Sequence, residues 1–115
     1  MTFDNWQEQL RRGALDLAIL LTLAPGARYG LQIIGELEEY TDLVVTEGTI
    51  YPILGRLARQ GLLEGEWVAA EAPHPRKYYR LTRLGRRRLE EMIAYWTMFS
   101  GKVERLVARA QKRSS

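Results

Sequence analysis

The sequence predicts a mainly α-helical fold with a small β-hairpin, built as a single unit. Apolar residues recur at helical spacing in four separate segments, whereas residues 77–81 alternate between apolar and polar side chains. The chain has 115 residues, enough for one modest core, and its 46% hydrophobic and 27% charged content is typical of a globular protein. We see no internal repeat or linker that would divide it further.

Residues 46–63 form the segment around which the other elements are arranged. Thr46 is expected to cap a helix by accepting a hydrogen bond from a first-turn N–H, and Gly61 is expected to close it. Hydroxyl and guanidinium groups on one face of such a helix suit the DNA major groove, since they reach both phosphates and base edges. The expected core face carries Ile50, Ile53, Leu54 and Leu57, and the polar face carries Thr49, Tyr51, Arg56 and Arg59.

Pro52 breaks a local rule inside this helix. Its ring should clash with the carbonyl of Gly48, and the preceding residue is biased away from helical geometry. One interpretation is a loose first turn or a later helix start, marking a contact surface. The other is a proline tolerated near a helix start.

Two helices are expected before this segment. Residues 5–24 are apolar nearly all round, so they should be buried on more than one side, and a second protomer is a natural source of that cover. Residues 29–40 form a second, amphipathic helix, and residues 42–45 connect it to Thr46. The helix over residues 29–40 and the helix that begins at Thr46 are joined by a short turn, and the latter has a cationic outer face. This arrangement indicates a helix-turn-helix.

After Gly61 the pattern changes to a β-hairpin, with strands at residues 62–68 and 77–81 and a tip containing Pro73 and Pro75. Three helices followed by a hairpin is the order of a winged helix-turn-helix. The tip carries His74, Arg76 and Lys77, which are placed to meet phosphates or a minor groove. Trp67 is expected to pack against the last helix.

The last helix should begin at a Thr82 cap and run to about residue 111. Its apolar residues alternate spacings of three and four over about three heptads, which is longer than the small core can cover, so a partner chain should cover the rest. We therefore expect a winged helix-turn-helix over residues 1–81 and a dimerisation helix over residues 82–115, bent near Gly101. The stripe comprises Leu89, Met92, Trp96, Phe99, Val103, Leu106 and Ala110.

The charge is unevenly distributed. Residues 1–60 carry a net charge of −3 and residues 61–115 carry +6, which favours a polyanionic partner, although a solvated basic helix face would give the same count. The absence of cysteine fits a reducing cytoplasm. The longest apolar run, residues 14–24, is too short to cross a bilayer, which needs about 20 residues.

Catalytic chemistry is not indicated. His74 is the only histidine, so no His-based metal cluster is expected, and no activated nucleophile or phosphate-binding glycine loop is visible. We predict no enzyme activity, no cofactor and no metal. The default role of Trp6 and Trp96 is apolar packing, and the alternative is stacking against a flat ligand.

The chain resembles the PadR family of transcriptional regulators in four segments: LRRGALDLAILLTL, YGLQIIGELEE, TEGTIYPILGRLARQGLL and PRKYYRLTRLGRRRL. The resemblance covers residues 10–99, and GTIYPILGRL and RKYYRLT are specific in combination. The single C-terminal helix is similar to the smaller PadR subgroup that includes the multidrug-responsive lactococcal regulator. Relatives often have a glycine-rich wing tip, whereas this chain has APHPR.

The resemblance implies a homodimeric winged-helix repressor that binds palindromic double-stranded DNA operators. It also implies a small hydrophobic or phenolic ligand at the dimer centre, because Trp96 matches a pore-lining tryptophan; Trp6 and Phe99 are expected nearby. The competing hypothesis is a winged helix used as a protein-interaction module without operator specificity. The expected DNA-binding residues are Tyr29, Thr46, Thr49, Tyr51, Arg56, Arg76 and Lys77.

Overall fold

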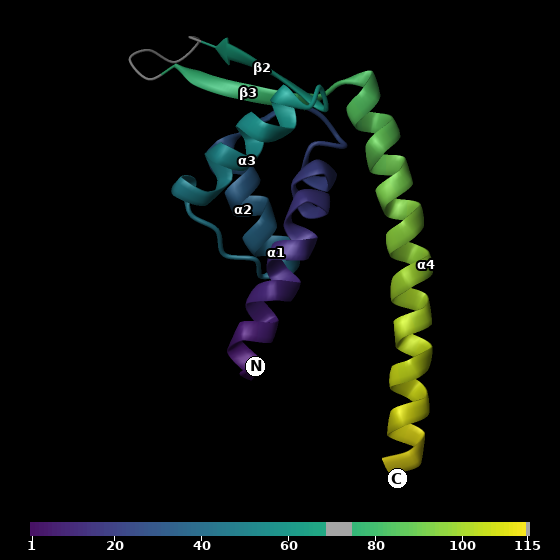
Figure 1. Ribbon diagram of the computed structural model, residues 1–115. Helices are drawn as coiled ribbons and strands as arrows, with labels where there is room; N and C mark the ends of the chain where they lie inside the picture. The colour runs from purple at the N-terminus through teal and green to yellow at the C-terminus, as the bar shows by residue number, and fades with distance from the viewer. Residues whose placement is uncertain (69–74, 115) are drawn as a thin grey trace.

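The computed structural model describes residues 1–68 and 75–114 and contains four helices and three strands in those ranges. Figure 1 shows three helices gathered beneath a small sheet, with the long fourth helix standing along one side. The elements are α1 (Phe3–Thr22), β1 (Arg28–Tyr29), α2 (Gly30–Thr41), α3 (Glu47–Arg59), β2 (Leu63–Val68), β3 (Arg76–Leu81) and α4 (Arg83–Ser114).

One hydrophobic core joins all of the helices to the sheet. Helices α1, α2 and α3 contribute apolar faces at helical spacing, α4 contributes only Leu89 and the partly buried Met92, and the buried ends of β2 and β3 close the core from above. Within the described residues, no buried side-chain nitrogen or oxygen lacks a hydrogen-bond partner. The most deeply buried side chains are Ile19, Leu20, Leu23, Ile33, Leu37, Ile50, Leu54 and Leu57.

The sheet has the strand order β1-β3-β2, and both pairings are antiparallel. The hairpin prediction is confirmed, and Tyr79 lies on the opposite face of β3 from Tyr78, as the alternation indicates. The strand β1 was not expected. It has only two residues, so no alternation can reveal it, and it forms because Arg28 pairs with Tyr79 in the folded chain.

Helix α3 is continuous through Pro52. Its first turn is regular, since both Thr49 and Ile50 donate backbone hydrogen bonds to the Thr46 carbonyl at 3.1 and 3.0 Å. The expectation of a loose first turn or a later start is therefore wrong. Thr46 occupies the capping position, but its hydroxyl contacts the Thr49 hydroxyl at 3.3 Å instead of accepting a backbone N–H.

Gly61 closes α3 as predicted. Its φ of 79° is left-handed, a conformation that glycine adopts without a steric penalty. This turn lets Leu62 donate a 3.0 Å hydrogen bond back to the carbonyl of Leu57. The end of α3 is thus fixed by its own backbone immediately before β2 begins.

Helix α4 begins at the Thr82 cap, whose hydroxyl accepts a 2.9 Å hydrogen bond from the Gly85 N–H, as predicted. The helix then runs without a break through Gly101, and the bend expected there stays a prediction. In Figure 1 it passes alongside α1 and continues beyond the N-terminal end of that helix. Its apolar stripe beyond Met92 is largely exposed in the single chain.

Two expectations for the hairpin have different outcomes. Trp67 does not pack against α4: the residue is 66% exposed, because it lies on β2 beyond the part of the sheet that covers the core. His74 lies outside the described residues.

Candidate nucleic-acid interface

The exposed face of α3 presents hydroxyl groups. Thr46, Thr49 and Tyr51 are all exposed, while Ile50 and Leu54 face the core, as the helical spacing predicts. Figure 1 shows that α3 and the β2–β3 hairpin lie together on the side of the molecule away from α4. These two elements therefore form one surface that a partner could contact in a single approach.

Arg56 is directed elsewhere. Its guanidinium lies 2.8 Å from the carboxylate of Asp16 on α1, and both side chains are close to 40% exposed. The same hydrogen bond raises the pKa of Arg56 above its ordinary value. The structure therefore places Arg56 against the first helix and does not group it with Thr49 and Tyr51, and sequence spacing alone could not reveal this pairing.

The outer face of the sheet carries an aromatic and cationic cluster. The Tyr29 and Tyr78 rings meet edge to face at 5.3 Å, and the guanidinium of Arg76 lies 4.5 Å from the centre of the Tyr29 ring. Two predicted DNA-binding residues, Tyr29 and Arg76, are thus in contact. Further along β3, Arg80 forms ion pairs with Glu64 and Glu66 at 3.3 and 3.5 Å, which reduces its availability to a phosphate.

The inner face of the hairpin carries Lys77. Its ammonium group lies 5.9 Å from the centre of the Trp67 ring and 5.5 Å from that of Tyr79. The structure therefore separates Arg76 and Lys77 onto opposite faces of β3, although both were expected on the wing. Trp67 is a candidate contact residue that the sequence prediction missed, since its exposure depends on how far the hairpin extends beyond the core.

Tyr51 joins α3 to the inner face of the hairpin. Burial raises the pKa of its phenol above the ordinary 10.0, with a smaller contribution from the nearby Glu47 carboxylate and from the Tyr79 phenol. The residue nevertheless remains 41% exposed. Tyr51 is therefore a neutral hydroxyl near pH 7 and can both donate and accept hydrogen bonds at this surface.

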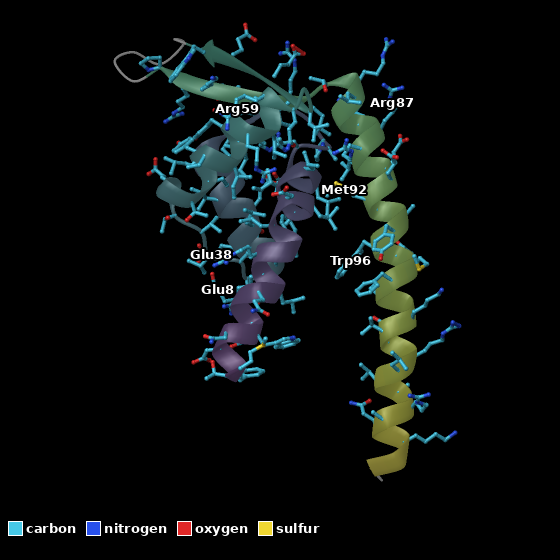
Figure 2. The ribbon with its side chains drawn as sticks, viewed as in Figure 1. Glu8, Glu38, Arg59, Arg87, Met92 and Trp96 are labelled. Atoms are coloured by element: carbon cyan, nitrogen blue, oxygen red, sulfur yellow. The ribbon has the colours of Figure 1, made fainter. Side chains whose placement is uncertain are left out.

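The run of arginines that follows the sheet lies at a different place. Arg83, Arg86 and Arg87 are exposed in the first turns of α4. Figure 2 shows Arg87 on the α4 side of the molecule, while Arg59 projects from α3 near the sheet. The basic half of the sequence thus supplies two separate surfaces, the wing beside α3 and the first turns of α4.

A second candidate site is an open apolar cleft of about 530 Å³ between α1 and α4. Trp96 and Phe99 both line it, and the Phe99 ring stacks on Tyr95 at 5.9 Å with an interplanar angle of 12°. Figure 2 shows Met92 and Trp96 on the side of α4 that faces α1. Residues from α1 complete the lining: Gln9, Leu10, Gly13, Ala14 and Leu17.

Trp6 is not part of this lining. It stacks instead on Phe3 with 5.9 Å between ring centres, at the exposed start of α1. The structure therefore brings together two of the three expected ligand-binding residues within one chain. Sequence spacing alone could not show that Leu10, Ala14 and Leu17 of α1 line the same cleft as Trp96.

In residues 1–68 and 75–114, no group of three or more metal-ligating side chains lies in position to hold an ion. None of the helices in these ranges combines the length and apolar character needed to cross a lipid bilayer.

Comparison with known proteins gives one consistent family. Residues 19–91 match the family described as the transcriptional regulator PadR-like family. An uncharacterised protein from Lysinibacillus sphaericus is 33% identical over 87 residues, which cover 74% of this chain and 80% of that protein. The PadR-like transcription factor from Bacteroides fragilis is 40% identical, with a TM-score of 0.74 over 89% of this chain and 98% of its own.

Two Bacillus structures extend the comparison. A PadR-like transcriptional regulator from Bacillus cereus is 34% identical, with a TM-score of 0.78 over 86% of this chain and 96% of its own. PadR from Bacillus subtilis, solved in complex with operator DNA, is 26% identical, with a TM-score of 0.65 over 70% of this chain and 45% of its own. These structures confirm the predicted mainly α fold with its small sheet.

Proposed function

Because the chain belongs to the PadR-like family of transcriptional regulators, we propose that it represses transcription by binding a palindromic DNA operator as a homodimer. Members of this family are regulators and not enzymes, which confirms the prediction of no enzyme activity. The observation that carries the proposal is the surface that the exposed hydroxyls of α3 share with Lys77 on the inner face of the wing. We propose the cytoplasm as its location, which fits the absence of cysteine.

On this proposal, α3 enters the major groove and the hairpin follows the adjacent backbone. Thr49 and Tyr51 are the hydroxyl groups available for base edges, since both are exposed on the outer side of α3. Arg76 and Lys77 are each positioned by an aromatic ring, so their charges are oriented before DNA arrives. We leave Arg56 out of the contact set, because its guanidinium is paired with Asp16.

The dimer is proposed from the exposed stripe of α4. Trp96, Phe99, Val103 and Leu106 are all between 39% and 56% exposed, and they follow one another at heptad spacing. A helix that exposes so many large apolar residues in sequence is typical of an interface. In an isologous pairing, α1 and α4 of one protomer pack against α1 and α4 of the other. Both copies of the stripe then become buried.

The α1–α4 cleft is the proposed ligand site. Its lining is mostly apolar, and it contains the stacked Tyr95 and Phe99 rings together with Trp96. A flat hydrophobic or phenolic compound fits such a lining, because stacking requires planar faces. Binding would release the operator if the ligand prefers the arrangement of the dimer that does not fit DNA.

Competition for DNA tests the proposal directly. The dimer is titrated onto a labelled fragment from upstream of its own gene, with random DNA of equal length as competitor. We expect a preference for the upstream site of roughly 10³-fold or more. Equal affinity for both DNAs would contradict an operator-binding function, and a basic protein-interaction module would then be the better description.

A further inference from the structure

Gly30 is the first residue of α2, and it is buried although it lies near the molecular surface. The group that covers it is the ring of Tyr51 from α3. A Cβ atom placed on Gly30 would lie 2.6 Å from both the Cε1 and the hydroxyl oxygen of Tyr51, and 2.7 Å from its Cζ. Carbon atoms do not approach so closely, so any side chain at position 30 displaces this ring.

The backbone does not require glycine at this position. Left-handed φ values, which favour glycine, occur in the described residues at Gly26, Gly61 and Asp42, but not at Gly30. Alanine is also the better helix former. The structural reason for glycine is therefore the space occupied by Tyr51.

This space lies at the centre of the proposed DNA surface. On the outer face of the sheet, the guanidinium of Arg76 lies over the ring of Tyr29, the residue that precedes Gly30. On the other side, Tyr51 lies near enough to Tyr79 for that phenol to contribute to its raised pKa. Gly30 thus lies between the two aromatic groups that connect α3 and α2 to the wing, and the position of the Tyr51 hydroxyl depends on it.

We propose that Gly30 is a positioning residue for operator recognition: it leaves the space in which the Tyr51 ring is held in the orientation that reads DNA. This inference rests on the proposed DNA-binding function and adds a residue that need not itself contact DNA. The atoms that a methyl group at position 30 would meet belong to the far end of the Tyr51 side chain, which can turn about its own side-chain bonds, so the substitution redirects the hydroxyl.

A double-mutant cycle tests the proposal. Operator and random-DNA affinities are measured for the wild type, Gly30→Ala, Tyr51→Ala and the double variant. We expect Gly30→Ala to lower operator affinity on the order of tenfold or more, with a much smaller effect on random DNA, because the lost contact is to specific bases. In the Tyr51→Ala background the same change should have no further effect, since the ring is no longer there.

Gly35→Ala is the matched control. Gly35 lies on the same helix, and a Cβ there meets nothing within 4 Å, so both DNA affinities should stay unchanged. Unchanged operator affinity in Gly30→Ala, or an equal loss with and without the Tyr51 ring, would overturn the proposal. A wild type that does not prefer its operator would instead contradict the proposed function.

Thermal unfolding provides a readout that does not depend on DNA. If Gly30 makes room for the Tyr51 ring, Gly30→Ala should lower the midpoint temperature of unfolding when Tyr51 is present. In the Tyr51→Ala background, the same substitution should leave this temperature unchanged or raise it. Should Gly30→Ala not fold, Tyr51→Phe and Tyr51→Leu replace it in the DNA titration. Both variants lack the hydroxyl, so both should lose the operator preference of the wild type, and a preference kept by Tyr51→Phe would overturn the proposal.

Discussion

A carboxylate introduced at Phe99 should separate the proposed dimer. Phe99 lies in the middle of the α4 stripe and is 48% exposed in the single chain. An aromatic side chain buries about 150–250 Å² when fully covered, so about 100 Å² of Phe99 remains for a partner to cover. At about 25 cal/mol per Å², this area contributes about 2.5 kcal/mol per protomer.

Symmetry doubles the effect. An isologous interface contains Phe99 twice, so Phe99→Asp removes about 5 kcal/mol from dimerisation, which corresponds to between three and four powers of ten in Kd. The buried carboxylates add a desolvation cost to this loss. The fold of each protomer should be affected much less, because Phe99 lies outside the buried core.

Sedimentation equilibrium measures the outcome over a range of protein concentrations. The wild type should sediment as a dimer, and Phe99→Asp as a monomer at micromolar concentration. Ala94→Asp is the control, since the helical repeat places it on the opposite side of α4 from the stripe. If Phe99→Asp sediments as a dimer with unchanged affinity, the α4 stripe is not the interface.

The remaining predictions concern DNA, ligand and pH. Arg76→Ala should weaken binding to all DNA sequences and lower the salt slope by roughly one, as measured by titration at several salt concentrations. Arg56→Ala should instead lower the free energy of unfolding by less than about 1 kcal/mol, since its ion pair with Asp16 is partly exposed, and should leave base preference unchanged in operator competition. Trp96→Ala should reduce both ligand binding and operator release, which calorimetric titration with the ligand and DNA titration can follow. Burial raises the pKa of the Tyr79 phenol above its ordinary 10.0. The neutral phenol therefore contributes fully to the free energy of unfolding below pH 10, and this contribution is lost as pH rises through the folded-state pKa. Unfolding curves at alkaline pH will detect the loss.

The helices and the hairpin were predictable because their signals are local. The apolar spacing of each helix, the Thr82 cap and the Gly61 turn all act within a few residues, and the structure has each in its expected place. The same logic located the exposed hydroxyls of α3. It did not require knowledge of which elements meet in space.

The rest of the site depends on contacts between distant segments. Asp16 and Arg56 are 40 residues apart, so no spacing rule could show that Arg56 is turned away from the DNA surface. Gly30 and Tyr51 meet only because α2 and α3 cross near the sheet. These two contacts decide which side chains remain available for DNA, and both are results of packing.

The junction between α3 and α4 determines how a ligand could control DNA binding. The Thr82 hydroxyl donates a 2.6 Å hydrogen bond to the Gly61 carbonyl, and the Thr82 N–H donates to the Leu62 carbonyl at 3.0 Å. Gly85 packs so closely on Leu62 that a Cβ would clash with that carbonyl oxygen.

The beginning of α4 is therefore fixed to the residues that follow α3 by two hydrogen bonds and by close packing against their backbone, which adjusts far less readily than side chains. The α1–α4 cleft, in contrast, is open and lined by partly exposed side chains. A ligand that widens this cleft must tilt α4 against α1, and the fixed junction then carries the end of α3 with it. Since a ligand shifts an equilibrium only by its differential affinity, the compounds that release DNA are those that bind the tilted arrangement more tightly.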